Sequence, residues 1–133
     1  ILRKPGQLSP EEFAIIRHHV NIAGYLIVDI PNADEVRKLA LHHHERWDGS
    51  GYPDGLSGEG IPHLARILAV ADAFSAVTLD RPHRRSLSYQ EAYEELKRVA
   101  GTQLDPNLVN AFAPVVRRLL ARSTAEDMAA SVK

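Results

Sequence analysis

The chain has 133 residues, of which 44% are hydrophobic and 25% charged, a size and composition typical of one globular domain with one packed core. Its 16 basic residues nearly balance 17 acidic ones, which excludes a strong overall field toward nucleic acid polymers or anionic membranes. No cysteine, leader or apolar run of the ~20 residues that a membrane span needs is present, so we expect a cytoplasmic protein or the cytoplasmic part of a larger signalling protein.

The first predicted helix covers residues 10–28. The chain opens at Ile1 with a stretch typical of a loop, from which we expect a fragment of a longer protein. Ser9 and Glu12 then form the pattern of a capping box, with proline in the first turn. Apolar residues recurring every three or four positions predict one buried face, with His19 beside it. That face consists of Phe13, Ile16, Val20, Ala23 and Ile27.

A second helix and a long loop follow. Pro31 and Asn32 interrupt the first helix, and residues 33–44 are predicted to form the second. Residues 45–61 are rich in glycine and proline, which excludes regular helix and predicts a loop whose length is typical of functional loops. The residues of the second helix predicted to face inward are Val36, Leu39 and Ala40.

Three further helices complete the prediction. The apolar run 64–79 favours a buried helix, and a second capping-box pattern begins another over residues 88–100. Asp105 and Pro106 begin a last helix that is expected to end at residue 121. Residues 122–133 form a tail that is either helical or disordered. The fold class is therefore all-α: a bundle of about five helices with a long Gly/Pro-rich loop, its domain covering residues 1–121.

The densest group of metal-ligand side chains is the triplet of residues 42–44, followed by Asp48. Adjacent helix residues point about 100° apart, so neighbouring histidines suit two metal ions lying side by side. Alternatively, histidines at a helix C-terminus simply complement the helix dipole in water.

Two side chains on other predicted helices favour the metal interpretation. Asp72 lies within an apolar run, where a buried carboxylate needs a cation, although an ion pair with Arg66 or Arg81 would serve. His19, taken alone, is equally typical of a hydrogen-bonded core histidine. Neutral imidazoles with one carboxylate suit Fe, Mn or Zn better than Ca or Mg. The complete set of candidate ligands is His19, His43, His44 and Asp72.

Two segments are candidates for binding an anionic substrate. The glycines of residues 48–53 would let backbone N–H groups and the Tyr52 hydroxyl line a pocket, although a bare glycine-rich loop is more often a turn. Arginines over residues 81–85 have the paired donors that grip phosphate, although a solvated face explains them as well.

Residues 43–53 read HHERWDGSGYP, and this run resembles the HHExxDGxGYP signature of the HD-GYP domain family. The similarity extends over roughly residues 1–116. It implies an HD-domain-like helical fold that hydrolyses cyclic di-GMP to GMP at two or three divalent metal ions, iron or manganese, which activate water and neutralise phosphate charge. By position, the resemblance implies metal ligands at His19, His43, His44 and Asp72, and substrate contacts at Gly51, Tyr52, Arg81 and Arg84.

The chain also departs from the family pattern. The family's upstream histidine, its His-Asp pair and the following lysine would precede Ile1, so no catalytic residue beyond the metal ligands is predicted, and we expect the chain to be inactive alone. Ala23 stands where glycine is common, Ser75 where aspartate is usual, and His83 where tyrosine is frequent.

Three functional hypotheses follow. The first is a cyclic di-GMP phosphodiesterase joined to an upstream receiver or sensor domain, of which this chain is the GYP half. The second is a degenerate module that binds nucleotide, or a partner such as a diguanylate cyclase domain, without hydrolysis. The third is a helical dimerisation module. Because missing N-terminal helices would leave apolar surface uncovered, we also expect self-association.

Overall fold

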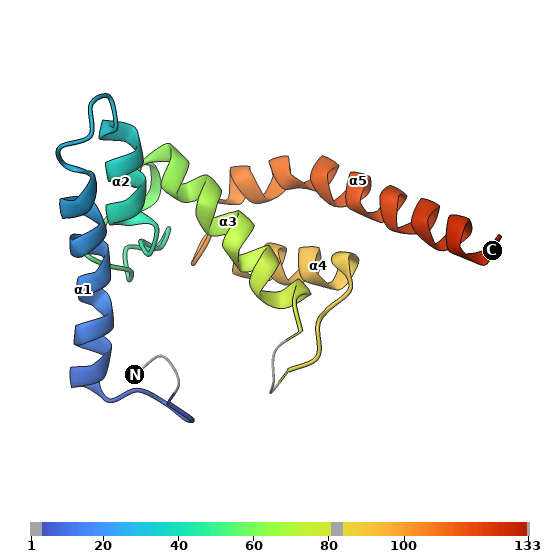
Figure 1. Cartoon of the computed structure of the whole chain (residues 1–133), viewed down its shortest axis with the longest axis horizontal. Helices are drawn as coiled ribbons and strands as arrows, with labels where there is room; N and C mark the ends of the chain where they lie inside the picture. Colours follow the sequence, from blue (N-terminus) through green and yellow to red (C-terminus); the bar gives the residue numbers. More distant parts are fainter. Residues whose placement is uncertain (1–3, 81–83, 133) are drawn as a thin grey trace. The chain divides into compact units, whose positions relative to one another are not determined.

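The computed structural model describes residues 4–80 and 84–132, and the all-α prediction is confirmed within them (Figure 1). The chain divides into two compact units, Ile1–Ala65 and Arg66–Lys133. Across the described residues, no helix is both long and apolar enough to cross a membrane. The helices are α1 (Pro10–Ile27), α2 (Asp34–His42), the short 3₁₀ helix η1 (Gly58–Gly60), α3 (His63–Thr78), α4 (Tyr89–Val99) and α5 (Pro106–Ser131).

In the N-terminal unit, α1 packs beside α2 (Figure 1). The predicted capping box is present: the Ser9 hydroxyl accepts from the N–H of Glu12, whose carboxylate accepts from the N–H of Ser9. Gly24 makes close packing possible, because a Cβ there would lie 2.6 Å from Cδ2 of Leu41. Val20 is fully buried, as the periodicity of α1 predicted.

The inward face of α2 differs from the prediction. The helix contacts α1 through Leu41, whereas Val36, predicted to face inward, is 52% exposed. The two residues lie about 140° apart around the helix, so they cannot share one contact face. Phe13, predicted on the buried face of α1, is likewise 44% exposed. Finally, α2 ends at His42, which places His43 and His44 in the turn after the helix.

The C-terminal unit holds a contiguous apolar core. The predicted capping box at Ser88 and Glu91 begins α4, and the Asp105 carboxylate accepts from two N–H groups at the start of α5. Asp105 also pairs with Arg66, its Oδ2 2.7 Å from Nη1 of the guanidinium, and is 3% exposed. The buried core residues are Val70, Phe74, Ala92, Leu96, Leu104, Val109 and Val116.

The last helix is longer than predicted. It continues to Ser131 instead of ending at residue 121, so most of the segment left open as a tail is helical. Residues 122–131 contain neither glycine nor proline, and most are good helix formers, so nothing local ends the helix earlier.

Candidate metal centre

Three of the four predicted metal ligands lie together in the N-terminal unit. His19 comes from α1, and His43 and His44 from the turn after α2. One ring nitrogen from each lies within 4.8 Å of the other two. The ring centroids are 5.6 Å apart for His19 and His43, 5.0 Å for His19 and His44, and 4.1 Å for His43 and His44. Such a cluster has the size that one divalent ion with three imidazole ligands requires.

Hydrogen bonds orient two of these rings for metal binding. Nδ1 of His43 contacts the backbone carbonyl of Ala40 at 2.8 Å, and Nδ1 of His19 contacts the carbonyl of Ile16. A carbonyl can only accept, so Nδ1 donates in each ring, and the neutral tautomer with this bond has its lone pair on Nε2. Metal-binding histidines commonly hold their second nitrogen in this way. The donor set and its hydrogen bonds therefore fit a divalent transition metal.

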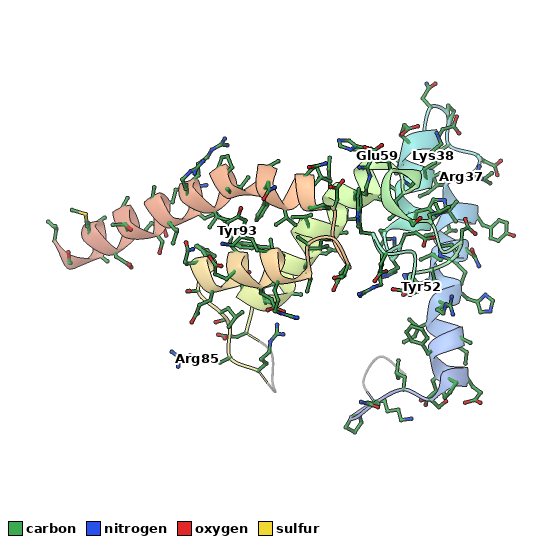
Figure 2. The ribbon with its side chains drawn as sticks, turned by 180° about the vertical axis from the view of Figure 1, so that it is seen from behind. Arg37, Lys38, Tyr52, Glu59, Arg85 and Tyr93 are labelled. Carbon is green, nitrogen blue, oxygen red and sulfur yellow. The ribbon has the colours of Figure 1, made fainter. Side chains whose placement is uncertain are left out.

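Tyr52 lies beside α1, next to the histidine cluster (Figure 2). Its ring stacks on His44 and meets Phe13 edge-on, with centroids 5.8 Å apart. The guanidinium carbon of Arg17 lies 5.0 Å from the centre of the Tyr52 ring, within cation–π range. Burial raises the pKa of the Tyr52 hydroxyl above its ordinary value, and this effect is larger than the opposing effect of the positive charge of Arg17. The hydroxyl therefore stays protonated near neutral pH and can donate a hydrogen bond.

The glycine-rich loop is held against the histidine pair by a buried carboxylate. Glu45, 4% exposed, accepts from the N–H of Asp54 through Oε1 at 2.8 Å and from the N–H of Leu56 through Oε2 at 3.0 Å. A Cβ on Gly51 would lie 2.5 Å from both the carbonyl oxygen of His44 and the backbone nitrogen of Arg46. Glycine is therefore required at Gly51 by close backbone packing.

In this region the structure changes the role predicted for Asp48 and reveals a role for Glu45 that the sequence did not predict. Asp48, grouped with the ligand-type side chains, accepts from the N–H of Ser50 at 3.0 Å and from its hydroxyl at 2.6 Å, bonds that lower the pKa of the carboxyl. It thus shapes a turn. No role was predicted for Glu45. Its position just before a loop rich in backbone N–H donors is the sequence feature that could have indicated one.

The remaining predicted site residues belong to the second half of the chain. Asp72 is exposed, so the expectation that it is buried is wrong. It lies two positions, about 200°, from both Val70 and Phe74, the residues that α3 turns into the core. Arg84 is exposed and donates to the carbonyl of Ala76. Arg81 lies outside the described residues.

Comparison with known proteins gives a consistent picture. The sequence profile described as "HD domain" matches residues 1–108. The chain is 41% identical over 122 residues to a cyclic di-GMP phosphodiesterase of Thermotoga maritima, covering 90% of this chain and 33% of that protein. It is 42% identical over 114 residues to a cyclic di-GMP phosphodiesterase response regulator of Xanthomonas campestris, covering 84% of this chain and 30% of the relative.

A relative named for another cyclic dinucleotide matches as well. It is a 3′3′-cGAMP-specific phosphodiesterase of Vibrio cholerae, 39% identical over 115 residues, which cover 82% of this chain and 21% of that protein. A crystal structure of a cyclic GMP-AMP-specific phosphodiesterase from V. cholerae aligns with a TM-score of 0.66 and 24% identity, covering 85% of this chain and 25% of that one. That likeness supports the fold. The chain spans a third or less of the length of each relative described here.

Proposed function

Because the chain belongs to the HD domain family, we propose that it supplies the GYP-bearing part of a cyclic dinucleotide phosphodiesterase, which hydrolyses cyclic di-GMP to GMP in bacterial signalling. The relatives support this proposal, since they are named as phosphodiesterases of cyclic di-GMP and of 3′3′-cGAMP. Both named substrates are cyclic dinucleotides. Cyclic di-GMP is the proposed substrate, and 3′3′-cGAMP is the alternative that the assay must include.

The proposal rests mainly on the convergence of His19, His43 and His44. Nε2 of His19 and of His43, with a ring nitrogen of His44, would hold the first divalent ion, and Asp72 is the proposed fourth ligand. Imidazole donors favour iron or manganese over calcium or magnesium. When bound, such ions supply Lewis acidity toward the phosphodiester and generate a nucleophile from water. A centre of two or three ions, as the resemblance to the HD-GYP family implies, would need further ligands beside these three histidines.

The other side chains are proposed to bind and orient the substrate. Tyr52 presents a protonated hydroxyl beside His44, so it can donate to a phosphate or ribose oxygen. The backbone at Gly51 lies against the backbone of His44, which keeps that part of the loop close to the histidines. Arg84 and Arg81 are proposed phosphate contacts because guanidinium groups bind phosphate through paired donors. No side chain among these is assigned a proton transfer.

The direct test is turnover by the full-length protein with Fe²⁺ or Mn²⁺ under reducing conditions. Cyclic di-GMP and 3′3′-cGAMP are supplied separately, and nucleotide products are separated by chromatography. We expect GMP from cyclic di-GMP, loss of activity in His44→Ala, and retention in His18→Ala, whose ring lies on α1 beside His19 but outside the cluster. Absence of turnover with either nucleotide and any metal would remove the proposal.

A binding module without hydrolysis is the second candidate, favoured by Ser75 where the family usually has aspartate. It would bind nucleotide, or a partner such as a diguanylate cyclase domain. Calorimetry measures the binding of cyclic di-GMP, and chromatography detects any product. Binding without product would support this candidate. An upstream receiver or sensor domain is proposed for either case.

Self-association is proposed from the apolar side chains that α1 leaves exposed. Ile15 is 59% exposed, Ile22 57% and Leu26 76%. Large apolar patches are uncommon on monomers. Sedimentation velocity over a range of concentrations should show association, and a monomer at every concentration would contradict it.

A further inference from the structure

A second group of ligand-type side chains lies in the N-terminal unit and shares no residue with the histidine cluster. His42 ends α2, Glu45 lies in the following turn, and Asp54 lies further along the loop. One donor atom from each lies within 4.8 Å of the other two. Nδ1 of His42 is 3.6 Å from Oε1 of Glu45 and 3.7 Å from Oδ2 of Asp54.

The polar groups of this cluster are incompletely satisfied. Nδ1 of His42 is buried and finds no hydrogen-bond partner among the residues that the structure describes. The Glu45 side chain is completely buried and accepts backbone N–H bonds from Asp54 and Leu56, and within residues 4–80 and 84–132 no Lys or Arg forms an ion pair with it, while the nearest cationic candidate, His42, stands 3.6 Å away. Burying a carboxylate without a compensating positive charge is unfavourable. A cation in this place would satisfy the imidazole nitrogen and the carboxylate together.

The distances favour a metal ion over a direct hydrogen bond. A charged N–H···O pair normally closes to about 2.7–2.9 Å, well below the 3.6 and 3.7 Å found between His42 and the two carboxylates. Nitrogen and oxygen ligands stand about 2.0–2.2 Å from a zinc ion, so their own separations exceed 3 Å. Carboxylate oxygens have more than one lone pair, so Oε1 of Glu45 can keep its bond to the Asp54 N–H while binding a metal.

We propose that His42, Glu45 and Asp54 form a separate site for a divalent transition metal, with zinc or manganese suited to its mixed imidazole and carboxylate donors. Successive residues point in different directions, so His42 does not compete with His43 for the same ion. Asp54 comes from the loop and His42 from the end of α2. An ion at this site would therefore crosslink the loop to the helix, holding Tyr52 in place without taking part in hydrolysis.

Metal stoichiometry of the full chain tests this site independently of the proposed function. The background variant His19→Ala/His43→Ala removes the first cluster. Equilibrium dialysis against Zn²⁺, followed by elemental analysis, should find one equivalent still bound. Adding Asp54→Asn should remove it and should leave the fold intact, because the Asp54 side chain is 61% exposed. Adding Asp29→Asn, an exposed aspartate outside both clusters, should leave it bound.

A spectroscopic signal adds a second readout. Trp47 is the single tryptophan of the chain and lies two residues from Glu45. In the background variant, Zn²⁺ should shift its emission in a saturable way, and Asp54→Asn should abolish the shift. The site is refuted if the background variant binds no Zn²⁺, or if Asp54→Asn leaves the bound equivalent unchanged. Neither result depends on nucleotide turnover, so failure of this site is distinguishable from failure of the phosphodiesterase proposal.

Discussion

The imidazole ring of His44 stacks on the phenol ring of Tyr52, with centroids 5.0 Å apart and 25° between the planes. The backbone N–H of Tyr52 also donates to the carbonyl of His44 at 3.2 Å. A predicted metal ligand and a predicted substrate contact are therefore fixed to one another by both ring and backbone. Changes in the loop should consequently alter the position of His44 in the histidine cluster.

The Tyr52 ring should matter for stability, and its hydroxyl mainly for substrate. Tyr52→Ala removes the contacts with His44 and Phe13, each aromatic pair contributing about 0.5–1.5 kcal/mol. We expect the free energy of unfolding to fall by roughly 1–3 kcal/mol. Tyr52→Phe keeps the ring and should stay within about 0.5 kcal/mol of wild type. Urea denaturation checks both, with the 77% exposed Tyr25→Ala as control. Equal losses for both Tyr52 variants would contradict this assignment.

A methyl group at Gly51 should displace the loop. Its Cβ would meet the carbonyl oxygen of His44 and the backbone nitrogen of Arg46 at 2.5 Å, and backbone atoms cannot rotate away. Gly51→Ala should therefore lower the free energy of unfolding by about 1–3 kcal/mol. Gly60→Ala, which would place its methyl group in open space, is the matched control and should have little effect. Denaturation followed by Trp47 fluorescence measures both, and equal stability of the two variants would show that the packing is not as described.

Removal of the Glu45 carboxylate should release the loop. In Glu45→Ala the N–H groups of Asp54 and Leu56 lose their acceptor, at a cost of about 1–3 kcal/mol for each group that stays buried. Amide hydrogen exchange should accelerate at these two positions. Glu59→Ala changes an exposed carboxylate near the same loop (labelled in Figure 2) and should leave both rates unaltered. Unchanged protection in Glu45→Ala would argue against the anchoring role.

Asp72 should influence metal binding more than stability. It is exposed on α3, so Asp72→Asn should leave the free energy of unfolding nearly unchanged. If Asp72 is a ligand, the Mn²⁺ affinity of the full-length protein should fall in this variant. Loss of an outer-shell partner already lowers metal affinity roughly 10- to 100-fold, so loss of a direct ligand should lower it by at least as much. Asp127→Asn, an exposed aspartate on α5, is the control. Titration calorimetry showing identical affinities for the two variants would exclude Asp72 as a ligand.

Local sequence signals predicted where helices begin better than where they end. Ser9 and Ser88 each cap a helix through contacts within three residues, so the pattern alone specifies them. The end of α5 carries no such signal, and the helix was predicted too short. Val36 was assigned to an inward face by its helical spacing from Leu39 and Ala40, and Asp72 by the apolar run around it, but burial depends on which face meets another element.

The candidate site was predictable where a fixed run of residues specifies it. His43, His44 and Tyr52 lie in one recognisable stretch, and His19 was found by its position beside the apolar face of α1. The role of Glu45 was not predictable in the same way, because its partners at Asp54 and Leu56 are brought to it only when the loop folds back. The same folding creates the cluster with His42, which no sequence pattern marked.

The central claim is that His19, His43 and His44 hold a divalent ion. The most direct test is Mn²⁺ titration of the full chain, comparing wild type, His19→Ala and His18→Ala by calorimetry. The account predicts that His19→Ala binds one equivalent fewer than wild type, whereas His18→Ala, altered at the adjacent exposed histidine, binds the same number with the same affinity. Wild-type stoichiometry and affinity in His19→Ala would contradict the claim.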